Sequence, residues 1–346
     1  MGRPTFFKMA ITKPRTEFAA ALNQICAERG IEPEVVLGTI QEAMLAAYKR
    51  DFGLKEGFEY EAKVDPQTGE THLYAWKKRT KVKTKKDVTP PGFGRIAAQV
   101  AKQVLLQKIR EAEKSAVLEE YSKRVGTLVN GMILRFDGPD VVVDIGKGEG
   151  RMPATEQIKG EKYNLNQRLT FLIKEIRETP KGKQIIVSRA DEGLVEGLFR
   201  REVPEVSSGA VQIKAIAREP GSRSKVAVLS TRVGVDPVGS CVGQKGIRVQ
   251  AVIDELGGEK IDIIQYSDDP SKFIAAALSP AQNLRVELEE KKKTAIVYVP
   301  EDQLSLAIGK AGQNVRLATK LTKFKIDIKQ EGKIPPKKTK KKAEKK

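Results

Sequence analysis

The chain has 346 residues, a formal net charge of +18 at neutral pH, and 40% hydrophobic but only 5% aromatic residues. That length predicts about two to four domains with aliphatic cores, and that charge indicates a polyanionic partner or an anionic membrane surface. No apolar run approaches the roughly 18 residues that a membrane span needs, and the first 14 residues lack the continuous apolar core of a signal peptide. Two distant cysteines, Cys26 and Cys241, offer neither a disulfide framework nor a metal-binding pair. We therefore expect a cytoplasmic protein that does not bind membranes.

The sequence carries few residues that could catalyse a reaction. Its one histidine, His72, lies in an alternating segment typical of a strand, where a surface or packing role is the ordinary one. No GxxxxGKS/T phosphate loop, GxSxG nucleophile elbow or HExxH zinc motif occurs in the sequence. The glycine-rich run at 146–151 lacks GxGxxG spacing and lies between strand-like runs, which favours a β-turn. We expect no catalytic residue, no metal and no cofactor.

Residues 15–124 are predicted to form the first domain, after a flexible segment of residues 1–14. Apolar spacing indicates two helices within 15–52, the second opened by Pro33. The alternating runs FEYEAKV and THLYAWKKRTKV flank the turn sequence DPQTG and predict a β-hairpin. Its second arm leads into seven Lys/Arg residues and no acid between Lys77 and Lys86. This run fits either a solvated edge strand or a contact surface.

A long helix is predicted from about Phe93 to Arg124. Apolar residues line one side of its first half, whereas its second half, REAEKSAVLEEYSKR, is mostly charged. A helix segment without an apolar face is typical of a connector between domains. We therefore expect this helix to lead out of the first domain.

From residue 125 to residue 190 the hydrophobic period changes to two. Five short strand-like runs, separated by Gly, Asp, Asn and Pro, predict a small closed barrel, most simply an OB fold. Such barrels commonly bind single strands through a face with aromatic platforms. Phe136, with Phe171 as a second candidate, supplies the aromatics in these strands. A barrel that serves only as a spacer is the alternative.

An internal repeat occupies the last third of the chain. The segment CVGQKGIRVQAV (241–252) has a partner in AIGKAGQNVRLA (307–318), and the tetrapeptide KIDI follows both, at 260–263 and 325–328. In a chain with 29 glycines a GxxG tetrapeptide alone is weak evidence, but the two copies share their surroundings. Each copy is preceded by two strand-like runs. The repeated unit is helix–strand–strand–helix–GxxG–helix–strand, and it predicts two domains at 191–268 and 269–330.

The repeated loop has the features of a phosphate-binding loop. Glycines lack Cβ, so a sugar-phosphate backbone can lie against them, and the following helix begins with unpaired N–H groups that favour anions. A helix–turn–helix corner in which glycine only relieves crowding is the alternative. Two matched copies in a strongly basic chain favour the KH architecture, whose GxxG loop clamps about four nucleotides of single strand. The residues predicted to bind RNA are Phe136, Gly243, Gln244, Lys245, Gly246 and Arg248, and then Gly309, Lys310, Ala311, Gly312, Gln313, Asn314 and Arg316.

The order of these domains and several of their segments resemble the NusA family of bacterial transcription elongation and termination factors. The segments are FRREVPEV, REPGSRSKVAV, DPVGSCVGQKGIRVQAV, ELGGEKIDI, AIGKAGQNVRLA and GFGRIAAQVAKQVLLQKIREAE. The resemblance covers residues 15–329. It implies an S-one-like OB barrel, two KH domains of the prokaryotic type, and RNA binding across the barrel and KH units. It also implies a monomer whose N-terminal domain docks on core RNA polymerase near the RNA exit, with other antitermination factors as further partners.

The sequence departs from the family pattern at two places. Between KKRTKVKTKK and PPGFGR the chain is short and basic, where family members often carry a longer and more acidic segment. After the second KH unit, residues 331–346 form a Lys-rich segment that is disordered by composition, where some members continue into acidic helical repeats. The first departure puts the details of the polymerase contact in doubt.

The sequence therefore predicts a multidomain α/β and β protein that is not an enzyme. Its expected function is that of a transcription factor that binds single-stranded nascent RNA and modulates elongation, pausing, termination and antitermination. The main alternative is an RNA chaperone or ribosome-assembly factor that uses the same KH units without polymerase. An RNA phosphorolysis enzyme also joins KH and S-one-like modules, but it needs large catalytic domains ahead of them, and residues 1–124 are too few.

Overall fold

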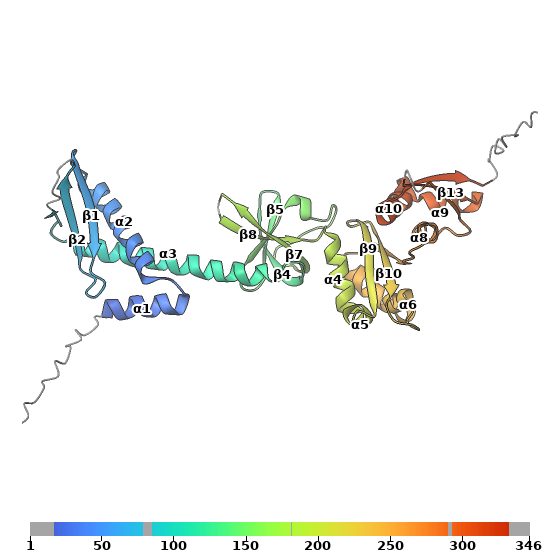
Figure 1. Ribbon diagram of the computed structural model, residues 1–346, viewed down its shortest axis with the longest axis horizontal. Helices are drawn as coiled ribbons and strands as arrows, with labels where there is room; N and C mark the ends of the chain where they lie inside the picture. Colours follow the sequence, from blue (N-terminus) through green and yellow to red (C-terminus); the bar gives the residue numbers. More distant parts are fainter. Residues whose placement is uncertain (1–16, 79–84, 181, 290–292, 332–346) are drawn as a thin grey trace, which may run out of the picture. The chain divides into compact units, whose positions relative to one another are not determined.

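A computed structural model describes residues 17–78, 85–180, 182–289 and 293–331. Within that part of the chain, three three-stranded sheets and one closed barrel alternate with helices (Figure 1). The chain divides into two compact units, residues 1–119 and 120–346. The predicted fold class, multidomain α/β and β, is confirmed. The predictions for the N-terminal segment, for residues 79–84 of the basic arm and for the Lys-rich C-terminal segment from residue 332 on lie outside the described residues.

The first unit contains the two helices, the hairpin and the start of the long helix, as predicted. Its elements are α1 (Glu17–Arg29), α2 (Pro33–Phe52), β1 (Phe58–Val64), β2 (Thr71–Lys77), the short β3 (Lys86–Asp87) and α3 (Phe93–Ser122), which runs on into the second unit. The strands pair in the order β1-β2-β3. Ile40, Met44, Leu73 and Phe93 are buried in its core. The unit therefore has a hydrophobic core of its own.

The five predicted strand runs close into a barrel. The strands are β4 (Leu128–Asp137), β5 (Asp140–Asp144), β6 (Glu149–Met152), β7 (Arg168–Thr179) and β8 (Gly182–Ser188), and they pair in the order β4-β5-β6-β8-β7. The turn expected at 146–151 is present, since the Ile145 N–H donates to the Gly148 carbonyl at 3.0 Å. Gly131 is tightly packed, because a Cβ there would lie 2.4 Å from Val143 Cγ1. Phe171 fills the barrel interior at 0% exposure, so its prediction as a stacking platform is wrong.

The two repeats fold into matching α/β units. The first contains α4 (Glu192–Glu202), α5 (Pro204–Ser207), β9 (Val211–Glu219), β10 (Arg223–Ser230), α6 (Pro237–Val242), α7 (Ile247–Glu255) and β11 (Lys260–Gln265). The second contains α8 (Pro270–Ala277), β12 (Arg285–Glu289), β13 (Thr294–Val299), α9 (Leu304–Ile308), α10 (Gln313–Thr322) and β14 (Lys325–Gln330). Their sheets have the orders β11-β10-β9 and β12-β13-β14. The KIDI tetrapeptides begin the parallel strands β11 and β14, so the predicted element order is confirmed.

The two repeats share a hydrophobic core. Ala217 on β9 and Ala227 on β10 belong to the same buried cluster as Ile274 on α8 and Leu317 on α10. Small alanine side chains let a helix approach a sheet closely, which strengthens the packing between the two surfaces. The second repeat therefore packs directly on the sheet of the first.

Buried charges are paired within the first repeat. The Arg218 guanidinium donates to both carboxylate oxygens of Glu259, with Nε–Oε1 at 3.0 Å and Nη2–Oε2 at 2.9 Å, and both side chains are almost fully buried. Glu259 also accepts from the Ser224 hydroxyl and from the Gly221 N–H. A carboxylate that accepts this many hydrogen bonds compensates the cost of burying the arginine.

Replacing Glu259 with Ala should lower the free energy of unfolding by about 3–5 kcal/mol, because Arg218 stays buried without its counterion. Urea unfolding followed by circular dichroism measures the change. Glu196→Ala is the matched control, since Glu196 pairs with Arg200 on the solvent face of α4 and should contribute less than about 1 kcal/mol. Equal losses in the two variants would contradict the prediction.

Candidate nucleic-acid interface

The two GxxG loops have the same backbone conformation. Gly243 and Gly309 have φ/ψ of 75°/174° and 73°/172°, and Gly246 and Gly312 have 79°/10° and 73°/16°. The residue before the second glycine is left-handed in both copies, at φ 53° for Lys245 and 51° for Ala311. Left-handed backbone at a non-glycine residue costs free energy and persists only where the surroundings impose it. The repeat therefore preserves a strained loop geometry and not only a sequence.

The first glycine of each loop is required by packing inside the protein. A Cβ at Gly243 would lie 2.7 Å from Arg248 Cγ, and one at Gly309 would lie 2.8 Å from Asn314 Cβ. Arg248 and Asn314 occupy the same repeat position, five residues after this glycine. Each donates to the carbonyl three residues before the glycine: Arg248 Nη1 to Ser240 at 2.7 Å, and Asn314 Nδ2 to Leu306 at 3.0 Å. These two side chains fasten each loop to the short helix before it.

The direct RNA contact predicted for Asn314 is not supported. Its side chain is 1% exposed, and Nδ2 also donates to the carbonyls of Leu278 and Ala307. Arg248 is also engaged, because its Nη1 lies 2.9 Å from Glu205 Oε2 as well as near Ser240. Each of these two side chains stabilises the conformation of its own loop through hydrogen bonds to the preceding helix.

Four predicted side chains within the two tetrapeptides face solvent. Gln244 and Lys245 in the first loop, and Lys310 and Ala311 in the second, are all exposed. Within the described part of the chain, neither lysine forms an ion pair, so both ammonium groups are available to an anion. The lysine occupies the third position of the first tetrapeptide and the second position of the other. The two loops therefore present their positive charge at different places.

The second glycine of each loop lies beside open space. The nearest atoms to a Cβ built at Gly246 and Gly312 are 3.9 Å away, at Val249 Cγ1 and Arg316 Nη1. Helices α7 and α10 begin directly after these glycines. Their first N–H groups and partial positive charge favour an anion at this point. A phosphate backbone can approach the second glycine of each loop, whereas the first glycine packs against the side chain of Arg248 or Asn314.

One exposed residue beside the first loop was not predicted. Ile247, the first residue of α7, is 71% exposed, although the helix buries Val252. At 3.6 residues per turn, five positions correspond to about 140° around the helix, so Ile247 points away from the buried face. An apolar side chain next to a phosphate-sized site can contact a base face. The exposure of Ile247 could have been predicted from the spacing of apolar residues along the helix that follows the loop.

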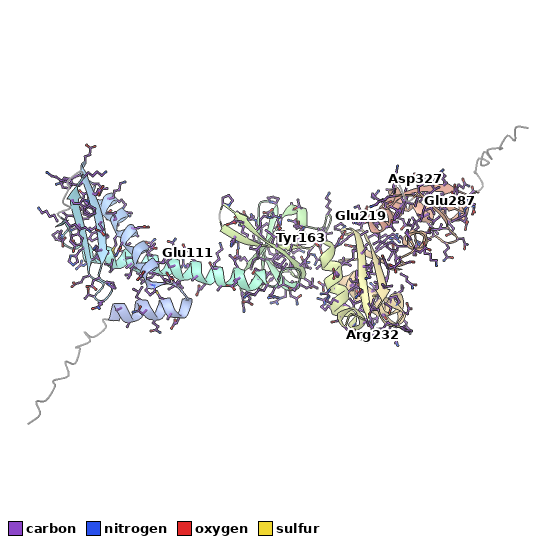
Figure 2. All side chains as sticks on the ribbon, viewed as in Figure 1. Glu111, Tyr163, Glu219, Arg232, Glu287 and Asp327 are labelled. Atoms are coloured by element: carbon purple, nitrogen blue, oxygen red, sulfur yellow. The ribbon has the colours of Figure 1, made fainter. Side chains whose placement is uncertain are left out.

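The second loop contacts the first repeat through Gln313 and Arg316. Arg316 Nε donates to Glu219 Oε1 at 2.7 Å, and Gln313 Nε2 donates to Glu219 Oε2 and to the Ser222 hydroxyl, both at 2.8 Å. Glu219, labelled in Figure 2, is the last residue of β9. The hydrogen bond from Arg316 holds the pKa of that carboxyl below its ordinary value. Two predicted RNA contacts are thus bound to a carboxylate that no sequence motif marked.

Comparisons with known proteins match three stretches of the chain to NusA domains. Residues 17–91 and 79–115 match the NusA N-terminal domain, residues 189–266 the NusA-like first KH domain, and residues 270–335 the NusA-like second KH domain. The transcription termination/antitermination protein NusA of Halalkalibacterium halodurans is 42% identical over 340 residues, covering 91% of this chain and 88% of that protein. Its namesakes in Bacillus subtilis and Thermus thermophilus are 42% and 40% identical, covering 91% and 90% of this chain and 91% and 89% of those proteins. The chain belongs to the NusA family.

In this member of the NusA family, the arginines near the end of β4 have carboxylate partners. Arg135 forms a two-pronged contact with Glu149 at 2.9 and 2.8 Å, and Arg151 reaches Asp137 and Asp140 at 2.6 and 2.7 Å. Arginines that already have carboxylate partners contribute little to phosphate binding. Phe136 is 49% exposed and lies in the alternate cross-strand row, and it stays a predicted stacking residue.

Two further residues of this NusA-family chain, Cys241 and His72, could in principle take part in chemistry. Cys241 is fully buried beneath the first loop, and burial raises the pKa of its thiol to about 11. His72 Nδ1 lies 3.0 Å from Asp87 Oδ2 at an exposed site. Among the described residues, no cluster of three His, Cys, Asp or Glu side chains could hold a metal ion. In the same part of the chain, no helix has the length and hydropathy to cross a membrane.

Gly309→Ala should destabilise the second loop by about 3 kcal/mol, because the new Cβ meets the Asn314 backbone nitrogen at 2.9 Å and because φ 73° with ψ 172° is a glycine conformation. Gly312→Ala is the matched control. It meets open space, and Ala311 already adopts a similar backbone, so the cost should be about 1 kcal/mol. Hydrogen exchange of the α9 and α10 amides measures both. Equal protection in the two variants would refute the packing argument.

Proposed function

We propose that this chain is an RNA-binding transcription factor. It docks on core RNA polymerase and guides single-stranded nascent RNA, and it thereby modulates elongation, pausing, termination and antitermination. Membership of the NusA family supports this assignment, because its relatives are named transcription termination/antitermination protein NusA. It acts in the cytoplasm as a monomer, with other antitermination factors as further partners, and no enzymatic step is part of its action.

The single observation that carries RNA binding is the pair of GxxG loops. They share a strained backbone, present one unpaired lysine each, and stand at the start of a helix. A net charge of +18 adds a long-range attraction for a polyanion. Each loop binds the backbone of about four nucleotides, with Lys245 and Lys310 on phosphates and the second glycines, Gly246 and Gly312, against the chain.

Each domain has its own role in the proposed function. Residues 15–124 bind polymerase and carry the connector helix, residues 125–190 form the S-one-like barrel, and residues 191–268 and 269–330 are the two KH domains. Phe136 gives the barrel one stacking contact. Because Arg135 and Arg151 of the barrel are paired with carboxylates, the barrel adds less affinity than the KH loops do.

A transcription assay with purified core polymerase tests this function. On a template with a strong pause and an intrinsic terminator, adding the full chain should change pause lifetime and the terminated fraction. An RNA chaperone or ribosome-assembly factor with the same KH loops would bind RNA but leave both quantities unchanged. That outcome would replace the transcription assignment with the chaperone assignment.

A further inference from the structure

A carboxylate of the first KH unit is bound to the arginine beside the second GxxG loop. Arg316 lies four residues after Gly312, and its Nη1 is 3.9 Å from the position of a Cβ on that glycine. Its Nε is 2.7 Å from Glu219 Oε1, its Nη2 is 3.3 Å from Oε2, and its Nη1 donates to the Ala311 carbonyl at 3.0 Å. Every nitrogen of the guanidinium therefore has a partner inside the protein.

Glu219 is held by more than the arginine. Its Oε2 also accepts from Gln313 Nε2, which donates to the Ser222 hydroxyl at the same time. The Glu219 side chain is 21% exposed, whereas that of Arg316 is 49% exposed. A partly buried carboxylate with several donors keeps its partner more firmly than a solvated surface pair does. The hydrogen bond from Arg316 holds the pKa of the Glu219 carboxyl below its ordinary value.

The first loop lacks this contact at the equivalent repeat positions, although its own Arg248 pairs with Glu205. The repeat position of Arg316 is taken by Gln250, whose Nε2 donates to Asp254 at 2.8 Å, and the position of Gln313 is taken by Ile247. The contact with Glu219 therefore belongs to the second loop alone among the two described loops. It joins residues 97 apart in the sequence.

A phosphate bound at the second loop would lie near two cations, Lys310 and Arg316. Lys310 is exposed and unpaired, so it can bind phosphate without breaking any contact. The Arg316 guanidinium uses three of its five N–H donors on Glu219 and Ala311, so a phosphate that reached a remaining N–H would lie beside the Glu219 carboxylate. Like charges at short distance repel, which weakens any phosphate contact with Arg316.

We propose that Glu219 masks Arg316, so that the second loop binds RNA phosphate through Lys310 and its backbone and not through Arg316. This inference rests on the proposed RNA binding of the loops. Glu219 is a positioning residue in this scheme: it limits the number of cations that the second KH unit offers to RNA. The charge that this surface offers to RNA thus differs from the sequence prediction, in which Arg316 counts as a free cation.

The test measures RNA binding by full-length variants at several salt concentrations. The probe is a fluorescein-labelled single-stranded RNA of random sequence and about twelve nucleotides, three times the stretch that one loop clamps. Glu219→Gln keeps the shape and one acceptor oxygen but removes the charge. It should tighten binding about three- to fivefold at low salt and steepen the slope of log K against log salt by about 0.7, the value of one added contact on a single strand.

The arginine variant gives the opposite and decisive comparison. Arg316→Gln alone leaves the Glu219 carboxylate without its counterion and should weaken binding, whereas Arg316→Gln combined with Glu219→Gln should return affinity and slope to the wild-type values, because the pair is neutral in both chains. Glu34→Gln is the matched control, because it makes the same charge change at an exposed position of α2 in the other unit and should leave the slope unchanged. Thermal unfolding of all variants monitors the KH core.

Three outcomes would overturn the inference. A flatter slope for the double variant than for the wild type would show that RNA contacts Arg316 in the unaltered chain. An unchanged slope for Glu219→Gln would show that the carboxylate masks nothing. Weaker binding by both single variants would make the pair a structural link only. None of these touches the proposed function, which fails instead if the wild-type chain does not bind the RNA at all.

Discussion

Replacing Gln244, Lys245, Lys310 and Ala311 together with aspartate is expected to lower RNA affinity by about 100-fold or more. The change removes two unpaired lysines and places four carboxylates where phosphates are proposed to lie, so attraction turns into repulsion. Folding should survive, because all four side chains are exposed. Aspartate also tolerates the left-handed backbone at 245 and 311 better than most residues do. Fluorescence anisotropy with single-stranded RNA and far-ultraviolet circular dichroism measure the two properties.

The same four positions changed to asparagine provide the control. Asparagine has the size of aspartate and accepts the same backbone, but it carries no charge. This variant loses only the two lysine contacts, so its affinity should lie between those of the wild type and the aspartate variant. Unchanged affinity of the aspartate variant, with an intact circular dichroism spectrum, would mean that the loops do not bind RNA.

The element order was predictable because each repeat is locally consistent. Period-two runs, the GxxG tetrapeptides and the two KIDI segments all indicate the same unit, and the structure has it twice. The barrel followed from five short alternating runs, and its closure from the fact that a small sheet must bury one face. Such patterns depend on residues that are close together in the sequence. Helices and strands could therefore be predicted where the spacing of apolar residues was clear.

The roles of individual loop residues were less predictable, because they depend on distant partners. Asn314 looked like a solvent-facing polar residue, yet its amide donates to the Leu278 carbonyl, 36 residues away. Arg316 looked like a free cation, but Glu219 binds it from another repeat. Phe171 alternates correctly for a strand, and only the closed barrel decides that its side of the strand is the interior.

The last turn of α3 is bound to the barrel, so a fragment boundary must keep the two together. Tyr121, near the end of α3, is buried, and its hydroxyl donates to the Ile145 carbonyl of the barrel at 2.6 Å. A fragment that begins at residue 125, the first residue of the predicted barrel domain, would lack this contact. A loss of RNA affinity in that fragment would not distinguish a destabilised barrel from a lost binding surface. The boundary between the two compact units lies after Glu119 instead. Fragments 1–119 and 120–346 each keep their own core.

Fragment 1–119 should co-elute with core RNA polymerase, whereas fragment 120–346 should bind RNA but lose most of the effect on pausing. The physical reason is that the first unit has a complete hydrophobic core but no GxxG loop, so a protein is its simplest partner. Size-exclusion chromatography with core polymerase measures docking, and pause lifetime measures function. Adding the two fragments together should restore little of the pausing effect, because linkage gives the RNA-binding units a high effective concentration near the polymerase.

A charge variant shows which surface of the first unit makes the contact. Replacing Lys77, Lys78, Lys85 and Lys86 with serine removes four positive charges at the described ends of the basic arm while sparing the buried core residues Leu73 and Ala75. If the arm is a contact surface, co-elution of fragment 1–119 should weaken and become less sensitive to salt. If it is a solvated edge strand, docking should not change, and the two-helix segment becomes the candidate surface. Should the unaltered fragment fail to bind polymerase, and the full chain leave pause lifetimes unchanged, RNA binding would remain but the transcription assignment would not.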